Sequence, residues 1–163
     1  MKSERRNRLT ARELRIWRDY IETAETIRSE LSARMQRDSG LSTGDYQVLL
    51  ALSEADRHRM RSSTLATHIG WQRSRLSHHL GRMERRELIR RQDCPTDSRG
   101  AEVVLTEQGL RAFRRSTSPH FLAIRETFLD ALTPEQLAAA AELSAALREH
   151  QTERKDGGHD PVP

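Results

Sequence analysis

Residues 62–86 read SSTLATHIGWQRSRLSHHLGRMERR, and this stretch decides how the rest of the chain is interpreted. In its second part, Leu76, Leu80 and Met83 fall within about 60° of one another on a helical wheel, which gives a narrow inward face. The other side carries small, polar and basic residues: Ser74, His78, Gly81, Arg82 and Arg85. A short helix from Ser62 or Ser63 comes first, and Gly70 ends it. This pattern predicts a helix-turn-helix.

A β-hairpin is expected directly after this motif. The segments 89–93 and 101–105 have the composition of strands, and the turn-forming residues Cys94 to Gly100 separate them. The hairpin therefore has a basic tip that contains Arg99.

Long helices are expected on both sides of these elements. Apolar residues at spacings of three and four predict a helix over 9–37 that ends at Ser39 and Gly40. Ser42 and Asp45 predict the start of the next helix, and Thr133 with Gln136 predicts the start of the last one. A kink or break is expected at Pro119. The outer stripes exceed what one small subunit can cover, so we expect them to pair with a second copy through Leu14, Trp17, Ile21, Leu31, Leu137, Leu143 and Leu147.

The predicted fold class is therefore mainly α with a small β-hairpin wing. We expect helical dimerisation regions at 9–40 and 107–150, a winged helix-turn-helix at 41–106, and flexible tails at 1–8 and 151–163.

Composition excludes several other classes of protein. The chain has 163 residues, of which 35% are hydrophobic and only 4% aromatic, a profile that disfavours a β-sandwich or barrel. No apolar stretch is long enough to span a membrane, and no signal-peptide pattern follows Met1, so we expect a cytoplasmic protein with no membrane partner. With Cys94 as its single cysteine, the chain cannot form an internal disulfide.

Positive charge is concentrated in one block. Residues 57–99 contain eleven Arg against four acidic residues, although the net charge of the whole chain is only +4. Arginine is the side chain best suited to bidentate contacts with phosphate and guanine, so the block predicts a nucleic-acid interface. A solvated charged surface, or a general architectural or RNA-directed binder, is the alternative left open at this point.

Other site chemistries have weaker support. His68, His78, His79 and Cys94 include ligand types for zinc, but no pair has a recognised ligand spacing. A redox role for Cys94 lacks a second cysteine within the chain. There is no pairing of nucleophile and base and no phosphate-binding loop. We therefore expect no enzymatic activity, no metal and no cofactor.

Several local motifs resemble the MarR family of winged-helix transcriptional regulators. These are Leu41-Ser42 with Tyr46-Gln47-Val48-Leu49, then Leu65-Ala66, Ile69-Gly70, Arg73-Ser74, Leu76-Ser77, Leu80, Arg82 to Arg86, Leu88 to Arg91, Asp97 to Gly100 and Leu105 to Gly109. Together they span about residues 41–109. Three residues depart from the family pattern: Trp71 replaces a small aliphatic residue, His79 takes a usually apolar place, and Glu87 stands where Gly is common.

The resemblance implies a homodimer that binds double-stranded DNA at a pseudo-palindromic site. It further implies a regulator, expected to be a repressor, with a small-molecule effector of undetermined identity as a further partner.

Each residue of the predicted interface has an expected role. The first turns of the second helix should meet base edges, with Arg75 or Arg73 on a guanine, although a phosphate contact is the alternative. Arg82, Arg85 and Arg86 lie later on the helix and should meet phosphate or acidic neighbours such as Glu84. Arg99 suits a minor groove, and the family pattern suggests that Asp97 orients it. The predicted DNA contacts are Gln72, Arg73, Ser74, Arg75, Ser77, His78, Arg82 and Arg85 on the helix, and Arg90, Arg91, Asp97 and Arg99 on the wing.

Overall fold

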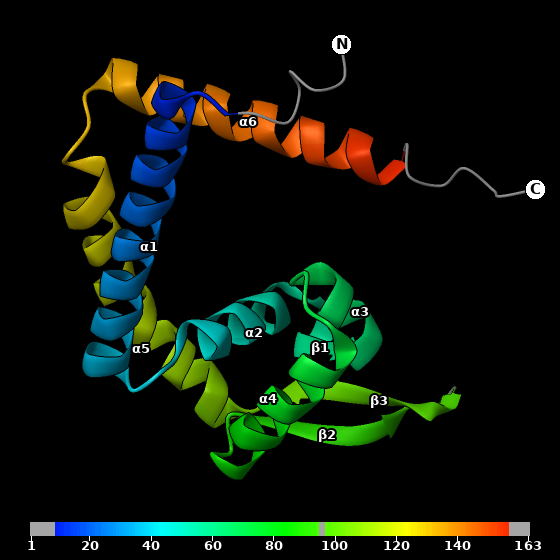
Figure 1. Cartoon of the computed structure of the whole chain (residues 1–163). Helices are drawn as coiled ribbons and strands as arrows, with labels where there is room; N and C mark the ends of the chain where they lie inside the picture. Colours follow the sequence, from blue (N-terminus) through cyan, green and yellow to red (C-terminus); the bar gives the residue numbers. More distant parts are fainter. Residues whose placement is uncertain (1–8, 95–96, 157–163) are drawn as a thin grey trace, which may run out of the picture. The chain divides into compact units, whose positions relative to one another are not determined.

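A computed structural model describes residues 9–94 and 97–156, with the side chains of 9–92 and 101–154. The elements, drawn in Figure 1, run in the order α1 (Ala11–Ser39), α2 (Thr43–Glu54), a 3-10 turn (Asp56–His58), β1 (Arg59–Arg61), α3 (Ser62–His68), α4 (Arg73–Arg85), β2 (Ile89–Cys94), β3 (Asp97–Leu105), α5 (Glu107–Ile124), a π-helical segment (Arg125–Leu129) and α6 (Pro134–Asp156). The predicted class, mainly helical with a β wing, is confirmed.

Capping residues set the starts of three helices. Thr10 and Glu13 form a reciprocal capping box at α1, and Ser42 and Asp45 form another at α2. Thr133 and Gln136 exchange the equivalent hydrogen bonds at α6. α1 ends at Gly40, whose φ of 69° is accessible to glycine without strain. The starts of α2 and α6 and the end of α1 agree with the sequence prediction, because the bonds that make them are local.

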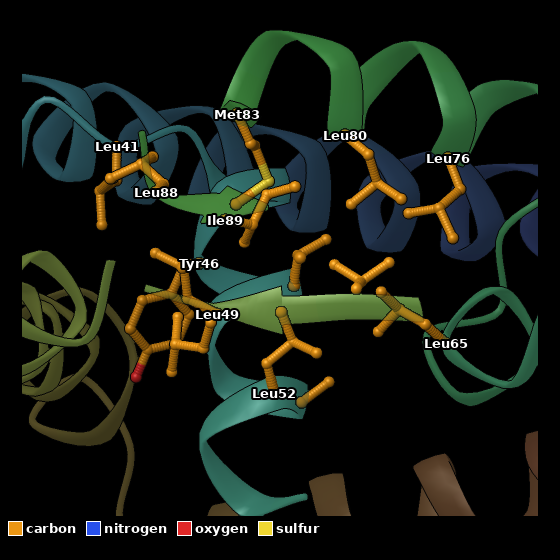
Figure 2. Close-up of a cluster of buried hydrophobic side chains, with 14 of the residues drawn as sticks. Leu41, Tyr46, Leu49, Leu52, Leu65, Leu76, Leu80, Met83, Leu88 and Ile89 are labelled. Atoms are coloured by element: carbon orange, nitrogen blue, oxygen red, sulfur yellow. The ribbon is translucent and has the colours of Figure 1, made fainter. Parts of the chain in front are cut away.

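One face of α4 packs in the hydrophobic core together with residues of α2, as predicted. Leu76, Leu80 and Met83 are buried. Figure 2 shows their side chains pointing from α4 into the cluster that includes Leu49 and Leu52 of α2. Gly70, with a φ of 70°, separates α3 from α4. The core thus buries the apolar face of α4 and leaves the opposite face exposed to solvent.

The sheet has three antiparallel strands in the order β1-β3-β2, whereas the sequence predicted a two-stranded hairpin. β1 pairs with β3 from Arg59 opposite Val104 to Arg61 opposite Glu102. A segment of three residues carries too little periodicity to be recognised alone. The predicted turn from Cys94 to Gly100 is also wrong in extent, because β3 begins at Asp97 and Cys94 pairs with Asp97.

The C-terminal helices differ from the expectation in two ways. α5 continues through Pro119 to Ile124, so the predicted break does not occur at the proline, and the helix changes instead to a π-helical segment at Arg125. α6 continues to Asp156, six residues past His150, after which a flexible tail was predicted. The predicted tails at 1–8 and 157–163 lie outside the described residues.

The described residues form two compact units, divided after Ala123. The first contains α1 to α4, the sheet and almost all of α5, and the second contains the π-helical segment and α6. Within the first unit, the ring of Tyr46 of α2 packs on Phe113 and His120 of α5, with ring centroids 5.3 and 4.7 Å away. The predicted dimerisation region, 9–40 with 107–150, stays a prediction.

Glu87 ends the turn after α4 in a left-handed conformation, with a φ of 58°. Its carbonyl oxygen accepts a hydrogen bond of 2.6 Å from the Thr106 hydroxyl, so the conformation is part of the junction between α4, β2 and α5. A side chain with a Cβ is strained in this region of φ and ψ, whereas glycine is not.

We therefore predict that Glu87→Gly raises the free energy of unfolding by about 0.5–1 kcal/mol, the strain relieved minus the entropy that glycine adds to the unfolded chain. Urea unfolding would measure it. Glu30→Gly, the same change in the middle of α1, is the matched control and should destabilise the protein, since glycine weakens a helix interior. Destabilisation by Glu87→Gly would contradict the strain at this turn.

Candidate nucleic-acid interface

The outer face of α4 is the centre of the candidate interface. Ser74, His78 and Arg85 are exposed and lie on the side of the helix away from Leu80. A Cβ on Gly81 would meet only the end of the Arg85 side chain, 4.0 Å away, so the backbone here is open to a close approach. A groove of B-DNA admits a helix with such a face, because small residues let the helix backbone come near the bases.

The first turns of α4 carry the remaining predicted reader residues. Gln72, Arg73, Arg75 and Ser77 are all exposed. Arg75 lies to one flank of the outer face, and its guanidinium stacks over the Trp71 ring, 4.1 Å from the centroid. A cation–π contact occupies the flat face of the guanidinium and leaves its N–H groups free at the edge. The stacking therefore preserves the bidentate donor that a guanine or a phosphate requires.

A buried carboxylate behind this face joins three helices. Asp45 is only 3% exposed, and its Oδ2 accepts hydrogen bonds from the Ser42 backbone N–H at 2.9 Å and from Arg86 Nη1 at 2.7 Å. Its Oδ1 lies 2.9 Å from His79 Nε2. Arg86 also donates to the carbonyl oxygen of Gly40 at 2.7 Å. One carboxylate thus connects the end of α1, the start of α2 and the length of α4.

The electrostatics of Asp45 follow from these contacts. Burial alone would raise the pKa of Asp45, but the hydrogen bonds from His79, the Ser42 backbone and Arg86, with the charge of Arg86, hold it well below its usual value. Asp45 is therefore ionised whenever the protein is folded near neutral pH. Arg86 forms its ion pair with Asp45. It does not pair with Glu84, the acidic neighbour that the sequence suggested.

Glu84 instead joins α4 to the wing. Its carboxylate accepts from the backbone N–H of Arg91 at 2.7 Å and from the Arg91 guanidinium at 2.8 and 2.7 Å. These hydrogen bonds lower the pKa of Glu84. Arg91 was predicted to contact DNA, and the structure gives it this internal partner, while Arg90 on the same strand is exposed. The side chains of Asp97, Arg99 and Cys94 lie outside the described residues.

Three residues of this region were missed as site residues by the sequence prediction: Asp45, Trp71 and His79. Asp45 was interpreted only as a capping acid, because nothing in the sequence places it beside a residue more than 30 positions later. Trp71 and His79 carried a signal, since both depart from the family pattern. The structure brings these two departures into contact, with ring centroids 5.1 Å apart and an interplanar angle of 89°.

A groove of about 800 Å³ lies beside this flank of α4. Glu25 and Arg28 of α1 line one wall, and the start of α2 with Trp71 and Arg75 lines the other. Glu25 and Arg28 form an ion pair of 2.5 Å. The groove is large enough for a small molecule and is lined mostly by polar side chains.

The described part of the chain lacks both a membrane-spanning helix and a metal-binding cluster. Within residues 9–94 and 97–156, no helix is both long enough and apolar enough to cross a membrane. Among the side chains of 9–92 and 101–154, there is no cluster of three or more His, Cys, Asp or Glu arranged to hold a metal ion.

Comparison with known proteins identifies relatives over most of the chain. A sequence profile described as MarR family matches residues 39–100. The crystal structure of AbsC, a MarR family transcriptional regulator from Streptomyces coelicolor, is 37% identical, with a TM-score of 0.81 over 90% of this chain and 98% of that one. Sco3205, a MarR family transcriptional regulator from the same organism solved in complex with DNA, is 39% identical, with a TM-score of 0.82 over 88% of this chain and 91% of that one.

A more distant structure shares the fold alone. The organohalide-sensing transcriptional regulator RdhR-CbdbA1625, in its 2,4-dichlorophenol-bound form, is 19% identical, with a TM-score of 0.77 over 89% of this chain and 83% of that one. No curated protein matches the chain.

The Asp45 cluster predicts a pH dependence of stability. Because the folded pKa of Asp45 lies below the unfolded value of about 3.9, its stabilisation is present above that value and is lost as the pH falls. We expect Asp45→Asn to lower the free energy of unfolding by about 2–3 kcal/mol near neutral pH, since it leaves Arg86 and His79 without their charged partner.

Urea unfolding at about pH 7 and about pH 3 would measure both effects, and the cost of the substitution should shrink at the lower pH. Asp19→Asn, on the exposed side of α1, is the control and should cost little at either pH. An equal cost of Asp45→Asn at both values would contradict the ionised state assigned to this carboxylate.

Proposed function

The chain belongs to the MarR family of transcriptional regulators, and from this we propose that it is a sequence-specific DNA-binding regulator that binds a pseudo-palindromic operator as a homodimer. Its family consists of transcriptional regulators, which confirms the expectation that it is not an enzyme. We expect such a regulator in a bacterial-type cytoplasm, which contains the DNA. The single observation that carries the proposal is α4, held from behind by the core and presenting an open, polar and basic face.

We assign the reader residues from their places on α4. Ser74 and His78 lie at the centre of the outer face in the first turns, where helix-turn-helix proteins contact base edges. Arg73 and Arg75 flank them. Arg75, stacked on Trp71, is our candidate for a bidentate contact with guanine, because stacking reduces the freedom it would otherwise lose on binding. Arg85 lies in the last turn and suits a phosphate contact.

The wing supplies the second part of the proposed interface. Arg90 is exposed on β2, and Arg91 holds the strand to Glu84 while its side chain keeps partial exposure. We propose that Arg99, on β3, enters a minor groove and that Asp97 orients it, as the resemblance to the family implied.

Exposed apolar surface supports the proposed dimer. On α1, Ile16, Trp17, Tyr20 and Ile21 are 43–57% exposed. On α6, Leu143 and Leu147 are 46% and 41% exposed. Contiguous apolar residues of this kind are rarely left in water by a monomer. A two-fold dimer would cover them and would present two copies of α4 about one turn of DNA apart, roughly 34 Å.

Repression by occlusion and a response to a small molecule are the finer parts of the proposal. A dimer bound across a promoter excludes polymerase without needing a second activity. The groove beside Trp71 and Arg75 is the place where a ligand would act most directly, because Arg75 belongs both to its wall and to the reader helix. A ligand that engages Arg75 there competes with DNA for the same side chain.

The experiment that tests the function is selection of bound duplexes from a random pool, followed by footprinting. A regulator should recover one symmetric site and bind it about 10³-fold or more tightly than random DNA. On that site, Arg75→Ala should cost about 1–3 kcal/mol and relax preference at one symmetric pair of positions, whereas Arg85→Ala should weaken all duplexes alike.

Arg12→Ala, on the exposed start of α1, is the matched control and should bind like the wild type. Equal affinity for all duplexes would instead identify an architectural nucleic-acid binder, the alternative that the basic block left open.

Assembly is tested separately. We predict a dimer at micromolar concentration that Leu147→Asp weakens by at least tenfold, since a buried carboxylate without a partner costs more than about 1.4 kcal/mol. Leu147→Met keeps an apolar side chain of similar volume and should leave the dimer intact. Sedimentation over a range of concentrations measures both. A stable monomer that binds a symmetric site tightly would contradict the dimer.

A further inference from the structure

His79 is a polar side chain on the buried side of α4. It is 7% exposed and shares that side with Leu76, Leu80 and Met83. Burying an imidazole among apolar residues costs free energy unless its nitrogens are satisfied. Its surroundings therefore indicate what the ring does.

The two ring nitrogens face two different groups. Nδ1 lies 2.7 Å from Nη2 of Arg82, and Nε2 lies 2.9 Å from Oδ1 of Asp45. A guanidinium can only donate, so Nδ1 must accept and carries no proton. The neutral ring then holds its proton on Nε2, close enough to Asp45 Oδ1 for electrostatic attraction, although the N–H does not point along a hydrogen bond to that oxygen. The geometry thus selects the tautomer with the proton on Nε2. In this tautomer Nδ1 accepts the hydrogen bond from Arg82.

The ring has little freedom to turn. Trp71 packs edge-on against it, and Gly44 of α2 lies on the same side. A Cβ on Gly44 would come within 2.8 Å of Trp71 Cη2 and 2.9 Å of His79 Cε1, closer than side chains tolerate. Gly44, Trp71 and His79 therefore fit one another, and a substitution at one would disturb the other two.

The same aromatic pair holds two arginines of the reader helix. Arg75 stacks on Trp71, and Arg82 donates to His79. The two arginines are seven residues apart, about two turns of helix, so they lie on one flank of α4. The contact draws the Arg82 guanidinium back by one turn toward the start of α4, which is the end that meets bases in helix-turn-helix docking.

We propose that His79 is a specificity-determining positioning residue: in its neutral form, oriented by Asp45, it holds Arg82 in place for the DNA site, and its protonation releases Arg82. The proposal rests on the DNA-binding function proposed above. A fixed arginine favours the one duplex that matches it, whereas a freed arginine can contact phosphate on any duplex.

The charges around His79 give the sign of the pH effect. Asp45 on α2 attracts a protonated ring, and Arg82 on α4 is repelled by it and loses its acceptor. Arg86 shares the Asp45 carboxylate, and Arg75 faces the ring only through Trp71. Protonation therefore strengthens the contact with Asp45 and breaks the contact with Arg82. The ratio of specific to non-specific affinity should fall on acidification.

The contact itself can be tested without DNA. Long-range ¹H–¹⁵N NMR of the free protein at about pH 8, above the range where imidazoles titrate, reports which nitrogen of His79 carries the proton. We expect an unprotonated Nδ1 and a protonated Nε2, and His79→Gln identifies the signal by removing it. A proton on Nδ1 would overturn the proposal whatever the protein binds.

The effect on recognition is tested with the selected operator and a scrambled duplex. The wild-type chain and its variants are compared on the same two duplexes. Between about pH 8 and the most acidic pH at which the protein stays folded, the affinity ratio should fall about fivefold to tenfold, the worth of one typical hydrogen bond. His79→Gln should make this fall much smaller, because its amide can accept from Arg82 and donate to Asp45 at any pH.

Two further variants complete the test. His68→Gln, the same change on the exposed side of α3, should keep the pH dependence, and Arg82→Ala should give a low ratio at both pH values. A ratio in the His79→Gln variant that falls as in the wild type would overturn the proposal. Absence of any preferred duplex would refute the proposed function instead, and the tautomer measurement would still decide the contact.

Discussion

A buried carboxylate needs partners, and the position of the reader helix depends on this requirement at Asp45. Asp45 caps α2 through Ser42, lies against His79 in the middle of α4 and pairs with Arg86 just after the end of that helix. Arg86 then reaches back to the last turn of α1 through Gly40. The core decides which face of α4 points inward. The Asp45 cluster adds a directional constraint that apolar contacts lack, because hydrogen bonds fix orientation as well as distance.

The arginine block serves two purposes that composition cannot separate. Arg86 and Arg91 pair with Asp45 and Glu84 and help to assemble the motif, whereas Arg82 is held by His79 at the edge of the outer face. Arg73, Arg85 and Arg90 are exposed on the outer face and the wing. A local excess of positive charge thus overstates the number of side chains free to contact phosphate. The positively charged surface that remains is still centred on α4.

Trp71 links the proposed interface to the groove beside it. Its ring supports Arg75 on one side and His79 on another, and both it and Arg75 line the groove between α1 and α4. A change at this ring would therefore reach two arginines of the reader helix at once. This arrangement gives a physical route by which occupancy of the groove could alter DNA recognition without moving the core.

The sequence by itself determined the parts of this protein that depend on neighbours along the chain. The capping boxes at Ser42 and Thr133 and the apolar spacing of α4 were predicted correctly, because each arises from contacts within one or two turns of helix. Only the tertiary structure decided β1, which exists because β3 offers it a partner more than 40 residues away. It also decided that Asp45 meets Arg86 and that Trp71 meets His79. Such contacts depend on how the helices cross, and the spacing of residues along one helix does not specify the place of the next.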